Sequence, residues 1–184
     1  MKRIVIHWTA GAHLSTATDR EHYHVLIEGD GKVVHGRRAP EANRSTSDGD
    51  YAAHTRALNT GSIGVAVCAM RQARERPFYS GPDPITAAQV KVLARVVSDL
   101  CDTYGIPITR QTVLTHAEVQ PTLGVTQRGK WDISWLPGMA APGDPVAVGD
   151  QLRAQVAAEM TGAPEEQVNP LAALWAWLRR VLGK

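Results

Sequence analysis

An uninterrupted apolar run, from Ile63 to Cys68, places the first limit on the fold of this chain. A run of this length without alternating polar residues is typical of a central β-strand whose two faces are both covered. The β-branched segment from Arg3 to His7 predicts a second buried strand, and this one ends at a histidine. Because such strands need a layer of helices or loops on each side, we expect an α/β domain built around them.

A hairpin pattern indicates that the sheet is mixed. Residues 23–28 and 32–35 are rich in strand-forming types, and a Gly-Asp-Gly turn lies between them at 29–31. Asp-Gly supplies the positive φ that tight hairpin turns require, so these two strands are expected to run antiparallel. Residues 113–116 predict one more short strand, which also ends at a histidine. The fold class we predict is a single α/β domain with a central mixed β-sheet flanked by helices, plus a C-terminal amphipathic helix.

Two helices are predicted to cover the sheet. Thr86 and Gln89 form a Thr-x-x-Gln capping box, the apolar residues that follow recur at helical spacing, and Gly105 supplies the stop. This helix is expected to pack on the sheet along its apolar stripe. A second amphipathic helix is expected over residues 148–160.

The end of the chain differs in composition from the rest. The predicted organisation is a globular domain over 1–160, a linker over 161–170 and a basic amphipathic helix over 171–184. The helix places Leu and Trp on one face and is too short to span a bilayer. We expect it either to bind an anionic membrane or lipopolysaccharide surface or to dock its apolar face on the domain.

Composition excludes several classes of protein. The 184 residues are 43% hydrophobic with a formal net charge of +2, which suits one globular domain and rules out a wholly disordered chain. The two cysteines, Cys68 and Cys101, are expected to be core filling. The sequence has no dense Lys/Arg block, so no nucleic-acid partner is expected. It also shows neither a secretory signal nor a run of about 20 apolar residues, so we expect synthesis in the cytoplasm without a signal peptide. We also expect the protein to be a monomer.

Three residues stand out as candidate metal ligands. His7 and His116 end predicted strands, and Asp132 lies in a long loop predicted over residues 118–143. Two imidazoles and one carboxylate, with a fourth position left for water, form a recurring ligand set of catalytic Zn²⁺. No local motif links the three positions, however, and on spacing alone the favoured interpretation of each histidine is a core residue bonded to a backbone carbonyl. Spacing alone leaves both interpretations open.

Short phrases spread along the chain carry a family resemblance. In order they are His7-Trp8-Thr9-Ala10-Gly11, Tyr23 to Ile27 before the turn at 29–31, Ala53-His54-Thr55 running to Asn59 and Ser62-Ile63-Gly64-Val65, Thr115 to Val119, and Lys130-Trp131-Asp132 followed by Pro137-Gly138. Together they resemble the type 2 N-acetylmuramoyl-L-alanine amidase family of zinc amidases, which includes phage endolysins and the peptidoglycan recognition proteins. The resemblance runs from about residue 4 to about residue 138.

The resemblance implies roles for particular residues. It implies that His7, His116 and Asp132 bind Zn²⁺, the third ligand in this family being either Cys or Asp. It also implies that Tyr23 and Lys130 assist catalysis, as residues at their positions do in relatives without a catalytic glutamate. If the segment around Lys130 is extended, Lys130 and Asp132 point the same way, and Lys130 can donate to the oxyanion of the reaction. Tyr23 can hydrogen-bond the zinc water or the leaving amine.

Three further residues keep a functional and a structural interpretation side by side. His54 matches a family histidine near the substrate groove, so it is expected to bind substrate, to support a ligand or to be structural. Trp131 is expected to stack on a sugar ring or to pack the loop. For Glu118, fixing the local turn or pairing with an arginine is favoured over a role as general base.

The activity implied for residues 1–160 is hydrolysis of the amide bond between N-acetylmuramic acid and L-alanine of the stem peptide. Bacterial peptidoglycan is the expected partner, and the expected role is that of a phage or prophage endolysin that acts on the cell wall after release. Two alternatives remain at this stage: a noncatalytic peptidoglycan-recognition module and a cytoplasmic amidase that recycles muropeptides. Retention of the three ligand positions with Tyr23 and Lys130 argues against the noncatalytic module.

Overall fold

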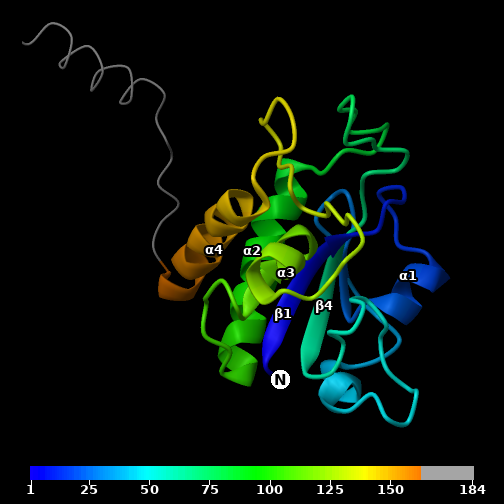
Figure 1. Cartoon of the computed structure of the whole chain (residues 1–184), viewed down its shortest axis with the longest axis vertical. Coiled ribbons are helices and arrows are strands. Elements are labelled where there is room, and N and C mark those ends of the chain that lie inside the picture. The colour runs from blue at the N-terminus through cyan, green and yellow to red at the C-terminus, as the bar shows by residue number, and fades with distance from the viewer. Residues whose placement is uncertain (163–184) are drawn as a thin grey trace, which may run out of the picture.

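The computed structural model describes residues 1–162, in which five strands form one sheet (Figure 1). The strands are β1 (Arg3–Trp8), β2 (Val25–Ile27), β3 (Val33–His35), β4 (Ser62–Val67) and β5 (Val113–Thr115). Their order across the sheet is β3-β2-β4-β1-β5. Neighbouring strands are parallel except for β3, the second strand of the predicted hairpin, which is antiparallel to β2. The predicted mixed sheet is confirmed, and the apolar run forms its central strand β4.

Helices cover one face of the sheet. The two long ones are α2 (Ala87–Tyr104) and α4 (Pro145–Thr161). They pack side by side (Figure 1), and their inner residues complete one apolar core with alternate residues of β1, namely Ile4, Ile6 and Trp8. Because successive side chains of a strand point to opposite faces, His7 lies on the other face of the sheet.

The face that carries His7 is covered by loops and short helices. These helices are α1 (Ala17–His22), which lies across the sheet from α2 and α4 in Figure 1, and the 3-10 helix η1 (Pro40–Arg44). Polar groups are buried and paired on this side: His24 Nε2 lies 3.0 Å from Asn43 Oδ1, and the Gly64 amide donates to His24 Nδ1 at 2.9 Å. The two faces therefore differ, one apolar under long helices and one polar under loops.

Helix α2 begins and ends where the sequence predicts. The Thr86 hydroxyl accepts from the Gln89 amide, and the Gln89 side chain accepts from the Thr86 amide, which completes the predicted capping box. Gly105 ends the helix in the left-handed conformation with φ 62°. Cys101 is buried on the inner side of α2 and Cys68 is buried after β4, and both are free thiols that fill the core as predicted.

The structure of residues 116–123 differs from the sequence prediction, in which a strand ends at 116 and a loop begins at 118. They form helix α3 (His116–Leu123), whose cap is a second box: Thr115 accepts from the Glu118 amide, and the Glu118 carboxylate accepts from the Thr115 amide at 2.8 Å. A short helix without a clear apolar stripe gives little periodic signal, although the box itself is visible in the sequence. His116 is therefore the first residue of α3 rather than the end of β5.

Part of the predicted organisation lies outside the described residues. This holds for the amphipathic helix over 171–184 and for all but the first two residues of the linker over 161–170. Both stay predictions. None of the helices within residues 1–162 is long and apolar enough to cross a membrane.

Candidate metal centre

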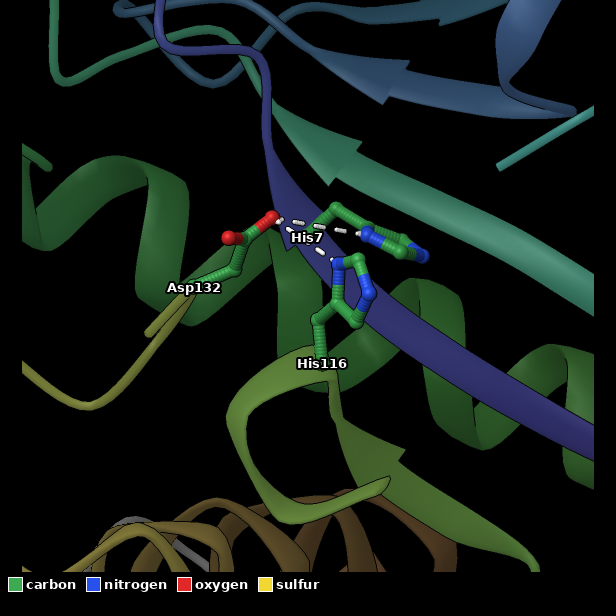
Figure 2. Close-up of side chains that lie close together, drawn as sticks. All are labelled: His7, His116 and Asp132. Atoms are coloured by element: carbon green, nitrogen blue, oxygen red, sulfur yellow. Dashed lines mark hydrogen bonds and ion pairs between the residues drawn. The ribbon is translucent and has the colours of Figure 1, made fainter. Parts of the chain in front are cut away.

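Three side chains from distant parts of the chain meet at the carboxyl edge of the sheet (Figure 2). His7 lies near the end of β1, His116 opens α3 directly after β5, and Asp132 lies in the loop that follows α3. Because β1 and β5 are adjacent and parallel, their carboxyl ends are neighbours, and this brings the two histidines together. One ligand atom from each of the three residues lies within 4.8 Å of the others, and all three residues are buried.

Both imidazoles present the same nitrogen to the carboxylate. Asp132 Oδ2 lies 3.2 Å from His116 Nδ1 and 3.6 Å from His7 Nδ1. Within the described residues, the buried Nδ1 atom of His7 has no hydrogen-bond partner. Two imidazole nitrogens and a carboxylate oxygen form a donor set that Zn²⁺ prefers, and here one of the nitrogens is buried without a partner. The residues present therefore fit the metal that the resemblance implies.

The charge states of the cluster also suit a metal cation. Burial lowers the pKa of His7 to about 4, so its imidazole is neutral at pH 7. Burial alone would raise the pKa of Asp132, but the imidazoles of His116 and His7 outweigh it, and the pKa lies below its usual range. Metal binding needs a neutral imidazole and an ionised carboxylate, and His7 and Asp132 are already in those states.

Tyr23 lies beside this cluster. Its ring centroid is 5.2 Å from that of His7, and its side chain is half-buried just before β2. Burial, and after it the charge of Asp132, raises the pKa of Tyr23 above the ordinary value. The hydroxyl therefore keeps its proton at neutral pH and is available as a hydrogen-bond donor.

The loop after α3 also carries Lys130 and Trp131. Lys130 is exposed, and its positive charge is among the causes that lower the pKa of His7. Trp131 is half-buried and meets the ring of Trp8 edge to face, with centroids 4.6 Å apart. Both residues line a cavity of about 530 Å³. The structure thus gives Trp131 a packing contact and places it at the wall of a cavity that His7, His116 and Asp132 do not line, and its role toward a sugar ring stays a prediction.

The backbone around Asp132 differs from the extended segment that the sequence predicts. Asp132 and Ile133 lie in a turn, and Ile133 has a left-handed φ of 63°. The turn carries Asp132 into the interior while Lys130 stays exposed. The extended conformation therefore does not continue through Asp132, and the common face of Lys130 and Asp132 stays a prediction.

His54 lies against the far side of a candidate ligand. It is only 8% exposed, and its Nδ1 atom is 3.2 Å from His7 Nε2. The two rings meet edge to face with centroids 5.3 Å apart. Among the interpretations that the sequence leaves open for His54, this contact favours support of His7.

Glu118 is engaged away from the cluster. Its side chain is fully buried, caps α3 through Thr115 and pairs with Arg153 of α4, with 2.8 Å between Arg153 Nη2 and Glu118 Oε1. A Cβ atom at residue 149 would lie 1.9 Å from the Glu118 carboxylate, so Gly149 leaves the space that the ion pair occupies. The structure agrees with the structural interpretation of Glu118 and ties α3 to α4.

Sequence reasoning missed Gln127. This residue is 4% exposed, and its Oε1 atom lies 2.9 Å from His116 Nε2. A glutamine in a polar loop is normally read as a surface residue, and no motif or spacing in the sequence marks this one. Only the fold reveals its position beside the ligand.

The fold and the cluster together define an α/β protein with a candidate metal centre at the carboxyl edge of its sheet. The chain belongs to the N-acetylmuramoyl-L-alanine amidase family, because the model of that family matches residues 1–138. The match ends at the same residue as the resemblance found in the sequence and confirms it. It includes all five strands and the three clustered residues, and it stops before α4.

Solved structures show the same fold. The N-acetylmuramoyl-L-alanine amidase LysC from Clostridium intestinale URNW is 17% identical, with a TM-score of 0.50 over 85% of this chain and 85% of that chain. The endolysin N-acetylmuramoyl-L-alanine amidase LysCS from the same organism is also 17% identical, with a TM-score of 0.51 over 85% of this chain and 83% of that chain. Comparison with curated proteins gave no match.

Proposed function

We propose that this protein is a zinc-dependent N-acetylmuramoyl-L-alanine amidase, which hydrolyses the amide bond between N-acetylmuramic acid and L-alanine of the peptidoglycan stem peptide. One observation carries the proposal: His7, His116 and Asp132 converge in a buried cluster, and His7 offers it a nitrogen without a partner. Membership of the amidase family supplies the reaction and the substrate class.

His7, His116 and Asp132 would hold the Zn²⁺ ion. Bound zinc supplies a water of lowered pKa and polarises the carbonyl under attack. The chain's own residues do the remaining work. The Lys130 ammonium donates to the carbonyl oxygen as negative charge develops on it. The Tyr23 hydroxyl, which keeps its proton because its pKa is raised, donates a hydrogen bond to the leaving amine as the C–N bond breaks, or accepts one from the attacking water.

A ligand variant tests this proposal. His116→Ala is expected to lose zinc and to release no stem peptides from purified murein, because it removes one of the three ligands. The matched control is His35→Ala, which removes an exposed histidine of β3. Zinc content by elemental analysis and new L-alanine N-termini are the two readouts. Release of stem peptides by His116→Ala at the wild-type rate contradicts the metal mechanism. A wild-type protein that binds murein without zinc and without release supports the noncatalytic alternative instead.

The biological role is a separate proposal from the reaction. We propose an endolysin that reaches bacterial peptidoglycan after release and lyses the host cell, with residues 1–160 as the catalytic domain and the basic segment 171–184 as a contact to an anionic membrane or lipopolysaccharide. We further propose that Trp131 binds the glycan, because it lines the cavity beside Lys130. Lysis of permeabilised cells by the purified protein tests the role, and loss of murein binding in Trp131→Ala tests the contact.

A further inference from the structure

We propose that Gln127 and His54 are positioning residues that fix the tautomers of the two histidine ligands, so that both present a bare Nδ1 atom to the metal. This inference rests on the proposed zinc site and adds two residues to it. The zinc ligands themselves lie at the carboxyl edge of the sheet, and each has a polar partner on the ring nitrogen that faces away from the cluster. Those partners decide where the proton of each neutral imidazole sits.

The orientation of the Gln127 amide follows from its contacts. One end of the amide lies 3.0 Å from the Arg56 carbonyl oxygen and 3.3 Å from the Val125 carbonyl oxygen. Carbonyl oxygens only accept hydrogen bonds, so this end is the NH2 group, and Oε1 is the end that faces His116 Nε2 at 2.9 Å. The backbone amide of Gln127 also donates to Gln120 Oε1 at 2.9 Å, which anchors the residue.

The tautomer of His116 follows. Gln127 Oε1 can only accept, so His116 Nε2 carries a hydrogen and donates it. In the neutral imidazole the other nitrogen, Nδ1, then has its lone pair free, and this atom is the one that lies 3.2 Å from Asp132 Oδ2. Two acceptors that face one another at this distance in a buried site repel unless a proton or a metal cation lies between them. With Nε2 protonated toward Gln127, the neutral imidazole leaves this position to the metal ion.

The tautomer of His7 follows in the same way from the contacts of His54. His54 Nε2 lies 3.3 Å from the Ser62 carbonyl oxygen, so it carries the hydrogen, and His54 Nδ1 is left as an acceptor. His54 Nδ1 is 3.2 Å from His7 Nε2, and the Thr55 hydroxyl lies between them, 2.8 Å from His54 Nδ1 and 3.3 Å from His7 Nε2. His54 Nδ1 can only accept, so the Thr55 hydroxyl donates to it and its oxygen is left to accept. His7 Nε2 therefore donates on this side, and its Nδ1 atom is the unpartnered nitrogen that faces Asp132.

The chain makes room for His54 at the centre of the sheet. A Cβ atom at residue 64 would lie 2.5 Å from His54 Cγ, so the glycine of β4 lets this ring lie directly on the strand. The Asn59 side chain accepts from the backbone amides of His54 and Thr55 at 3.0 and 2.8 Å, which holds the loop over the sheet. These contacts give His54 one position, in which it supports His7.

The Gln127→Met variant tests the role of Gln127 in zinc affinity. Methionine keeps the length of the side chain, but its thioether sulfur is only a weak acceptor for His116 Nε2. Competition with a chromogenic chelator on the full-length protein should show Zn²⁺ affinity lowered by about 10- to 100-fold, the usual effect of losing such a partner. The matched control is Gln89→Met in α2, because Gln89 is also buried and bonds the backbone oxygens of Ile27 and Cys68 at 2.9 Å. It should keep wild-type affinity.

A second measurement reads the tautomer directly and does not depend on any variant. Long-range ¹H–¹⁵N NMR spectra of the zinc-loaded wild-type protein should show the proton of His116 and of His7 on Nε2. A proton on Nδ1 of either ring overturns the inference. So does wild-type zinc affinity in Gln127→Met. Failure of the wild-type protein to bind zinc at all is a different result, because it overturns the proposed function itself.

Discussion

At the scale of single residues, the charge state of each group in the candidate site is set by its burial and by its neighbours. His7 and Asp132 lie in a buried site in which burial keeps the imidazole neutral and the neighbouring imidazoles keep the carboxylate ionised. Lys130 stands apart from them, since it is exposed and has no place in the ligand cluster. The residues that would hold the metal are therefore distinct from the residues that would act on the substrate.

Lys130→Ala tests this separation. Loss of a donor to the developing oxyanion lowers kcat by about 10²- to 10³-fold in comparable sites. Zinc content should stay at the wild-type level, because Lys130 contributes no ligand atom to the cluster. Steady-state kinetics on purified murein and elemental analysis measure the two effects. A zinc-free Lys130→Ala protein shows that this residue supports the structure of the site, and an unchanged kcat removes it from the mechanism.

At the scale of elements, helix α3 joins the site to the rest of the domain. It begins with His116, and two residues later Glu118 pairs with Arg153 of α4 in a buried ion pair. Arg153 also donates to the Val113 carbonyl oxygen of β5 at 2.8 Å. The Arg153 guanidinium group of α4 thus bonds to both β5 and α3, the helix that begins with the candidate ligand His116.

Arg153→Met tests the structural role of this ion pair. Removal of one partner leaves the Glu118 carboxylate buried without its counter-ion, which typically costs about 3–5 kcal/mol of folding free energy. Urea denaturation should show that loss, and the exposed pair Arg37–Glu21 gives a control in Arg37→Met, which should change stability by less than about 1 kcal/mol. The complementary variant Glu118→Gln should keep kcat within a few-fold while it lowers stability. A kcat lost by orders of magnitude in folded Glu118→Gln makes this residue a catalytic base.

Local signals explain which elements the sequence predicts. The start, stripe and stop of α2 all lie within the helix itself, so Thr86 and Gly105 place its ends. Strand β1, which contains His7, and strand β5, which ends directly before His116, are likewise visible as apolar runs. Helix α3 has a cap but little periodicity, and it goes unpredicted.

Contacts between distant segments explain what the sequence does not predict at the site. The turn at Asp132 requires a left-handed φ at Ile133, which a β-branched residue rarely adopts, so sequence preference points the other way. The side chain of Gln127 is held by a hydrogen bond to the carbonyl oxygen of Arg56, a residue far away in the chain. Residue types and the family resemblance indicate the ligands, but the residues that orient them become visible only when the fold brings these segments together.

At the scale of the whole molecule, buried histidines make stability depend on pH. Burial lowers the pKa of His7 to about 4, and it also lowers the pKa values of His24 and His54. In the unfolded chain these histidines titrate near the ordinary 6.5, so between that value and the lowered pKa the unfolded state binds more protons than the folded state. Stability must therefore fall as pH decreases through this window.

Urea denaturation of the zinc-free protein across pH measures this dependence. Unfolding free energy should be level between pH 7.5 and 8.5 and should fall from about pH 6.5 to about pH 4, by an amount on the order of 3 kcal/mol for His7 alone. In His7→Phe the slope should be smaller than in the wild type. A wild-type curve that stays flat down to pH 5 shows that these histidines are not held in their neutral forms.

The segment 171–184 belongs to the same scale, because its proposed role concerns access to the cell wall rather than chemistry. Its Arg179, Arg180 and Lys184 supply positive charge for an anionic surface. Deletion of 171–184 should leave the release of stem peptides from purified murein unchanged and should slow lysis of cells with intact envelopes. Equal lysis by the full-length and the shortened protein contradicts a membrane or lipopolysaccharide contact.

A zinc amidase is defined by which bond it cleaves and by whether the cleavage needs zinc. Mass spectrometry of purified murein digested by the zinc-loaded protein tests both points, with the chelated protein as the matched sample. The account predicts free stem peptides that begin with L-alanine, glycan strands of unchanged length, and neither product after chelation. Cleavage within the glycan, cleavage inside the stem peptide, or full release by the zinc-free protein contradicts it.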